Sequence, residues 1–207
     1  MHILLVLEII GTIAFAVSGA IVGIQKKMDI FGVSILGLTT AVGGGVLRDL
    51  ILNITPPAAF RTPVFALIAI MISIIIFIKP IHPSIWQVHV VYEKTLLVMD
   101  SIGLGLFTVV GIQVAKSSNA DTNLFLETFV GVLTGVGGGL LRDVFAGLTP
   151  SIFVRNFYAS ASIIGAWLCV LLWPYLGDNA SMFVGAASIV ILRLLAAYFH
   201  WNLPRPQ

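Results

Sequence analysis

A heptapeptide that occurs twice constrains this chain more than any other feature. Residues 43–49 read GGGVLRD and residues 137–143 read GGGLLRD, each after an apolar run. Consecutive glycines weaken a helix, because each costs about 1 kcal/mol relative to alanine. An arginine and an aspartate inside an apolar segment are also costly and usually face a cavity or a partner. A chain that accepts both costs twice, at matched positions, is expected to use the feature.

The surrounding sequence has the composition of a membrane protein. Hydrophobic residues make up 58% of the chain and charged residues only 10%, whereas soluble domains carry about 25% charged residues. Apolar stretches of about 20 residues are long enough to cross a bilayer as helices. We therefore expect an all-α integral membrane protein with seven transmembrane helices, at about 3–24, 30–52, 62–79, 96–115, 124–147, 154–176 and 181–200.

The two halves of the chain are similar to each other. An offset of 92 places Glu8 on Asp100, and an offset of 94 places one heptapeptide on the other. Each half holds three expected helices, and because three is odd the second half enters the membrane from the opposite side. The sequence thus predicts two inverted repeats and a seventh helix. The expected parts are repeats at 1–79 and 96–176, a loop at 80–95, and the seventh helix with its tail at 177–207.

Basic residues in the loops predict the orientation, because they gather on the cytoplasmic side. Arg61 and Lys116 lie on the side of the N-terminus. Six basic residues lie on the other side: Lys26, Lys27, Lys79, Lys94, Arg155 and Arg205. This difference favours an N-terminus outside and a C-terminus in the cytoplasm.

The glycine triplets have two interpretations. They allow a helix to bend and to expose carbonyl oxygens to a water-filled cavity, where such oxygens suit alkali cations. Alternatively, they only allow close helix packing. We favour bending, which makes Gly43, Gly44, Gly45, Gly137, Gly138 and Gly139 candidate pore kinks, with Thr39, Thr40 and Thr134 as candidate pore hydroxyls.

The motif charges are candidate pore or mouth residues. Helix neighbours in sequence point to different faces, so we expect the arginine and aspartate of one motif to seek other partners. Their depth in the expected helices predicts the pairs Glu8–Arg48 and Asp100–Arg142, one near each mouth, with Asp49 and Asp143 attracting cations. Ion pairs that only fix helix packing are the alternative. Arg193, in the seventh helix, is expected to reach toward the cytoplasmic interface.

Other function classes have no support in the sequence. No catalytic set, nucleotide-binding loop or zinc motif is present, so we predict neither an enzyme, nor a cofactor, nor a metal site beyond transient potassium or sodium ions. The net charge of +2 is small and dispersed, which argues against nucleic acid as a partner.

The doubled GGGxxRD motif, the two inverted three-helix repeats and the seventh helix resemble prokaryotic members of the trimeric intracellular cation channel family. The resemblance covers Glu8 to about Phe199. It implies a homotrimer in the inner (plasma) membrane of a bacterium or archaeon, in contact with membrane lipid. It also implies a pore for potassium in each protomer, passing the second and fifth helices at their glycine kinks.

Three hypotheses follow. The first is a passive cation channel, and the second is a secondary transporter of a small amino acid such as glycine, since inverted repeats with broken helices also suit alternating access. The third is a membrane scaffold that conducts nothing. We find no lone midplane acid and no aromatic gate that would mark a substrate site, which favours the channel.

Overall fold

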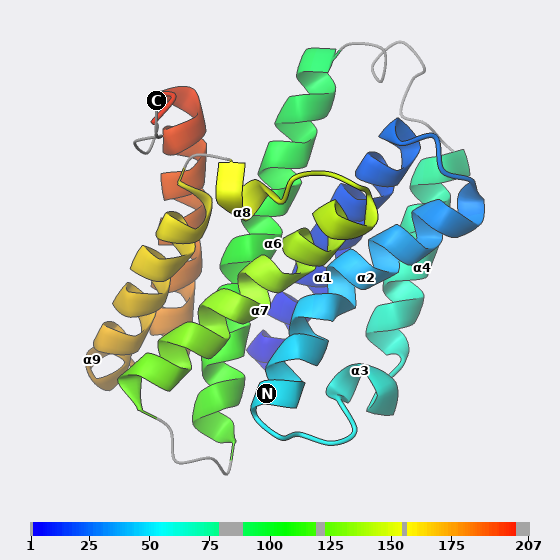
Figure 1. Ribbon diagram of the computed structural model, residues 1–207. Coiled ribbons are helices and arrows are strands. Elements are labelled where there is room, and N and C mark those ends of the chain that lie inside the picture. Colours follow the sequence, from blue (N-terminus) through cyan, green and yellow to red (C-terminus); the bar gives the residue numbers. More distant parts are fainter. Residues whose placement is uncertain (1, 79–88, 119–122, 155–156, 202–207) are drawn as a thin grey trace.

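The computed structural model describes residues 2–78, 89–118, 123–154 and 157–201. The regular elements of these residues are helices (Figure 1). They are α1 (His2–Gln25), α2 (Ile30–Ile51), α3 (Ala58–Arg61), α4 (Val64–Ile78), α6 (His89–Ser117), α7 (Leu124–Phe145), α8 (Ser151–Val154) and α9 (Tyr158–Tyr198). The predicted all-helical membrane architecture is therefore confirmed, and Figure 1 shows the long helices running through the molecule.

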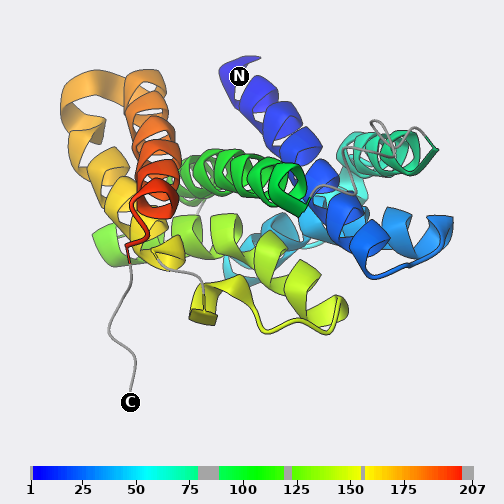
Figure 2. The same ribbon diagram turned by 90° about the horizontal axis from the view of Figure 1, so that it is seen from above.

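The number of separate spans differs from the prediction. Five helices of the described residues are long and apolar enough to cross a membrane, whereas α4 has only 15 residues and falls short of that length. The predicted sixth and seventh helices both lie within the 41-residue α9, on either side of a kink. Gly177 interrupts α9 with a left-handed φ of 73°, a conformation that suits glycine. Figure 2 shows the two arms of α9 folded back against each other.

The fourth predicted helix begins earlier than expected. The sequence analysis placed residues 89–95 in a loop, but α6 begins at His89 and continues to Ser117. Polar residues such as Glu93 and Lys94 suggested a loop, yet both are good helix formers and extend an apolar helix without breaking it.

The ends of α2 and α7 are built alike. Asp29 caps α2 by accepting a hydrogen bond from the Gly32 amide (2.7 Å), and Asn123 caps α7 by accepting one from the Leu126 amide (2.8 Å). Such side chains satisfy amides that a helix start leaves unpaired. Both helices end before a residue with positive φ, Asn53 at 55° and Gly147 at 63°, as expected where a helix terminates in a left-handed residue.

The helices α2 and α7 cross at the centre of the molecule, side by side in Figure 1. A Cβ atom on Gly44 would collide with the Thr134 carbonyl, and one on Gly138 would collide with the Thr40 carbonyl. The two main chains therefore touch directly at this point, which we call the α2–α7 crossing. Helical structure continues through both triplets, and close packing is one function of their middle glycines.

Candidate functional site: two charged mouths

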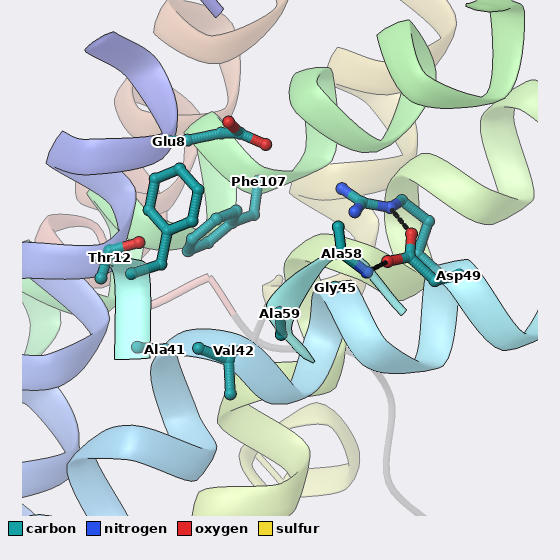
Figure 3. A pocket seen from close by; sticks show the side chains of 11 residues that line it. Glu8, Thr12, Ala41, Val42, Gly45, Asp49, Ala58, Ala59 and Phe107 are labelled. Carbon is teal, nitrogen blue, oxygen red and sulfur yellow. Dashed lines mark hydrogen bonds and ion pairs between the residues drawn. The ribbon is translucent and has the colours of Figure 1, made fainter. Parts of the chain in front are cut away.

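A cavity of about 50 Å³ lies beside the first motif. Its polar lining is Glu8 and Thr12 from α1 with Arg48 and Asp49 from α2, and small or aromatic residues complete the wall. Figure 3 shows Glu8 on one side of this cavity and Asp49 on the other. Gly45 forms part of the wall, and the nearest atom to a Cβ placed there is an Arg48 nitrogen at 3.8 Å. We call this space the Glu8 cavity; it is large enough for several water molecules.

The ion pair in the Glu8 cavity is not the predicted one. Arg48 Nε donates to Oδ1 of its neighbour Asp49 (2.8 Å), and among the described residues Glu8 forms no ion pair with Arg48. The prediction failed because an arginine side chain is long enough to turn back along the helix surface, although the two Cβ atoms diverge. Glu8 faces the cavity as a carboxylate without a salt-bridge partner in the described part of the chain.

Each motif aspartate also holds the short helix that follows it. Asp49 Oδ2 accepts a hydrogen bond from the Ala58 amide at the start of α3, and Asp143 Oδ2 accepts one from the Ser151 amide at the start of α8, both at 2.7 Å. In each case the other oxygen receives the arginine. Because both oxygens of each carboxylate accept hydrogen bonds within the protein, Asp49 and Asp143 have a structural role in this conformation. The sequence analysis did not predict α3 and α8 as helices of their own.

The second motif lies in a denser network of charges, at the predicted second mouth. Arg142 donates to Asp100 (2.6 Å), as predicted, and also to Asp143 (2.8 Å), against the expectation that motif neighbours would not pair. Arg142 reaches the Ser18 hydroxyl on α1 as well. All of these groups are buried, and buried charges need partners of opposite sign. The two carboxylates are matched only when a second arginine, Arg193, is counted.

Arg193 joins this network, which corrects the sequence analysis. We expected Arg193 to reach the cytoplasmic interface, but only 3% of it is exposed. Its Nη2 lies 3.5 Å from Asp100 Oδ2, and its guanidinium carbon lies 4.5 Å from the centre of the Tyr158 ring. The sequence does contain a sign of this arrangement. Asp100 and Arg193 both lie in apolar helices, and charged residues in such helices usually pair with one another.

A second cavity, of about 400 Å³, approaches the network from outside. It is lined by Glu93, Arg142, Asp143 and Thr149, among others, and neither Asp100 nor Gly139 belongs to its lining. We call it the Arg142 vestibule. Its lining includes the motif charges but no motif glycine, whereas the lining of the Glu8 cavity includes Gly45 as well as its motif charges.

The predicted pore hydroxyls lie away from both cavities. Thr40 and Thr134 are buried against Gly19 and Gly111, and their hydroxyls donate to carbonyls one turn earlier in their own helices. Thr39 lines an apolar groove on the outer side of α2. In this conformation all three hydroxyls bond within their own helices, and their role as pore groups stays a prediction.

An aromatic pair lies between the middle of α1 and the middle of α6. The two rings belong to Phe15 and Phe107, and their centroids are 5.2 Å apart. Phe15 packs on Gly103 and Phe107 on Gly11. The sequence analysis found no aromatic gate, because each half carries only one of the two rings and only the packing of α1 on α6 brings them together. Phe107 forms the inner wall of the Glu8 cavity.

Comparison with known proteins assigns the family. A family model described as glycine transporter matches residues 5–80 and 97–174. The UPF0126 inner membrane protein YadS of Escherichia coli K12 is 37% identical over 96% of this chain and 93% of its own length.

Two solved structures resemble the chain throughout. The trimeric intracellular cation channel orthologue from Rhodobacter sphaeroides has a TM-score of 0.88 and 30% identity, over 97% of this chain and 100% of that one. A prokaryotic TRIC channel crystallised in KCl has a TM-score of 0.89 and 32% identity, over 98% and 100%. The chain is thus a multi-pass membrane protein of the family whose sequence model is described as glycine transporter, and a bacterial member of the trimeric intracellular cation channels.

Proposed function

We propose that the protein is a monovalent cation channel, chiefly for potassium, with one conduction path in each protomer of a homotrimer. The Glu8 cavity carries the proposal, because it brings a carboxylate without an ion-pair partner among the described residues into a space next to the α2–α7 crossing. A carboxylate at a pore mouth attracts cations without binding them too tightly to leave. The similarity to cation channels over nearly the whole chain supports the same conclusion.

In this proposal the ion path follows α2 and α7. It runs from the Glu8 cavity past Phe15 and Phe107 to the Arg142 vestibule. In this proposal the present conformation is a closed one, in which the Phe15–Phe107 pair and the Arg142–Asp100 ion pair are the barriers to ions. Bending at the outer glycines of each triplet opens the path and exposes carbonyl oxygens to the ions.

The proposed topology has two inverted three-helix repeats and a seventh helix, with the N-terminus outside and the C-terminus in the cytoplasm. The two arms of α9 and the short α4 count as separate crossings in this topology. Matched caps and matched helix ends on α2 and α7 support the repeat. So does the family model, which matches each half separately.

Transport of a small amino acid is the second candidate. The description of the family model favours it, and so does the pairing of charges across the Glu8 cavity. Glu8 suits an ammonium group and the terminal nitrogens of Arg48 suit a carboxylate, while Gly45, Ala41 and Ala58 leave room only for a small side chain.

One pair of measurements separates the two candidates. Purified protein is fused into planar bilayers with a potassium gradient, and the same preparation is assayed for glycine uptake in proteoliposomes. Discrete single-channel currents that reverse near the potassium equilibrium potential support the channel. Absence of currents, together with saturable glycine uptake, would replace it with the transporter.

A further inference from the structure

The two mouths differ at one matched position, and the difference suggests a closing residue. Gly45 and Gly139 are the last glycines of the two triplets. Beside Gly45 there is open space belonging to the Glu8 cavity. Beside Gly139, a Cβ atom would lie 2.6 Å from the Tyr158 hydroxyl and 3.5 Å from Asp100. The tyrosine thus occupies at one mouth the space that is empty at the other.

Tyr158 is held in this place from two sides. It is the first residue of α9, after Phe157 with its left-handed φ of 58°. Its ring packs under the Arg193 guanidinium at 4.5 Å, and Arg193 in turn faces Asp100. Only 2% of Tyr158 is exposed. These contacts place the Tyr158 hydroxyl against Gly139, next to the buried Asp100 and to Arg142, which the Arg142 vestibule reaches.

The hydroxyl of Tyr158 is buried and packs beside Gly139 but makes no hydrogen bond within the described residues. Buried hydroxyls are usually paired, so a residue selected only to fill space here would more simply be phenylalanine. An unpaired hydroxyl suits a side chain that also occupies a second position, in water, when the mouth is open.

The first half of the chain has no equivalent device in its described part. The offset of 94 places Tyr158 on Val64, which is half exposed at the start of α4. Arg193 lies in the seventh predicted helix, outside both repeats. Tyr158 thus differs from its counterpart in the first repeat, and Arg193 lies outside both repeats.

We propose that Tyr158, held by Arg193, is the side chain that seals the second mouth, which is formed by Asp100, Arg142 and Gly139. This mouth opens when Tyr158 moves away from Gly139. The proposal rests on the proposed conduction path, which the seal would interrupt. It assigns a gating role to Tyr158 and a positioning role to Arg193.

The test measures access of a water-soluble reagent to the sealed space. Ser18 is buried next to Arg142, and Ser18→Cys puts a thiol there with little change in size. The native Cys169 is buried and serves as an internal control, because it reacts only if the protein unfolds. Full-length protein is treated with a charged methanethiosulfonate, and adducts are counted by mass spectrometry.

Replacing Tyr158 with the residue of the first repeat should open the mouth. We expect Tyr158→Val to raise the modification rate of the Ser18→Cys thiol at least about ten-fold while Cys169 stays unmodified, and to raise the fraction of time that single channels are open. An unchanged modification rate of that introduced thiol in the folded variant would overturn the seal. An increased rate in a protein that carries no current would retain the seal and refute the conduction proposal.

A second pair of variants keeps the test valid if Tyr158→Val unfolds, in which case the Ser18→Cys thiol and Cys169 would both react. Gly139→Ala pushes on the Tyr158 hydroxyl, whereas Gly45→Ala meets nothing closer than 3.8 Å. The first should raise the modification rate of the Ser18→Cys thiol and the second should not. Equal rates in these two folded variants would also overturn the proposal.

Discussion

At the scale of single residues, the motif aspartates do more than balance charge. Asp49 and Asp143 each join an arginine on their own helix to the first amide of the next short helix. Charge-assisted hydrogen bonds of this kind are about twice as strong as neutral ones. The adjacency of Arg and Asp in the heptapeptide is explained by this geometry, because one carboxylate reaches both partners only from the end of the long helix.

Asp49→Asn should destabilise the protein. The change leaves Arg48 buried without its ion-pair partner, which costs about 3 kcal/mol or more. Asp29→Asn is the matched control, since asparagine caps helices about as well as aspartate. Thermal unfolding in detergent should show a clearly lower midpoint for Asp49→Asn and almost no change for Asp29→Asn; similar midpoints would show that Arg48 finds another partner.

Glu8→Gln tests the carboxylate that faces the Glu8 cavity. Removing its charge should lower the potassium conductance and the preference for potassium over chloride by about two-fold or more at low ionic strength, where screening is weak. Asp178→Asn removes an equal charge at an exposed position beside Gly177 and should change neither. Single-channel recording at low and high salt checks both, and an unaltered Glu8→Gln channel would remove Glu8 from the path.

The sequence predicts an ion pair correctly where two charged residues lie at the same depth in neighbouring helices. It does not predict a pair that forms because a long side chain bends back along its own helix. Asp100 and Arg142 were paired correctly because they lie at equal depth on neighbouring helices. The Arg48–Asp49 pair was missed because the periodicity of a helix describes Cβ directions and not the ends of long side chains. Tyr158 carried no signal, since a tyrosine near a helix start is ordinary at a membrane interface.

At the scale of helices, the glycine triplets have divided functions. The middle glycines form the α2–α7 crossing, where main chains touch. The last glycines face a cavity at one mouth and Tyr158 at the other. The sequence alone leaves bending and packing as alternatives for the whole triplet. Three neighbouring residues on a helix point in three directions, so packing by the middle glycine leaves the last glycine free for a different role.

Alanine substitutions should separate these functions within one triplet. Gly44→Ala places a methyl group against the Thr134 carbonyl, which belongs to a helix backbone and cannot move aside. We expect a loss of stability of about 2 kcal/mol or more, as for other overpacked cores. Gly45→Ala has open space and should be tolerated, gaining helix propensity. Size-exclusion profiles after heating in detergent check both, and equal stability would show that the crossing is loose.

At the scale of the whole molecule, the two halves share a framework and differ in the residues that surround their last motif glycines. The caps and motif charges of α2 and α7 follow the sequence repeat closely, and were predictable because spacing and composition determine them. The break between the two arms of α9 lies at Gly177, where the sequence places it. The early start of α6 was not predictable, since no glycine or proline separates residues 89–95 from the apolar helix that follows. The central aromatic pair depends on the packing of two distant helices and has no local signature.

The proposal of one path per protomer predicts the form of the currents. A homotrimer with three independent paths should show three equally spaced conductance levels in a single insertion event. The native mass in detergent, corrected for bound detergent, should be three times the chain mass of 22.2 kDa. A single conductance level from a trimer would instead place one shared pore on the symmetry axis.

The direct contact between α2 and α7 has a mechanical consequence. Gly44 and Gly138 stand about two-thirds of the way along their helices, and because neither has a side chain the two backbones lie in direct contact there. Two helices that touch at one point can still change the angle at which they cross, and the resulting displacement grows with distance from the contact. A small change in the crossing angle therefore displaces the N-terminal ends of α2 and α7 most, while the backbone at Gly44 and Gly138 barely moves.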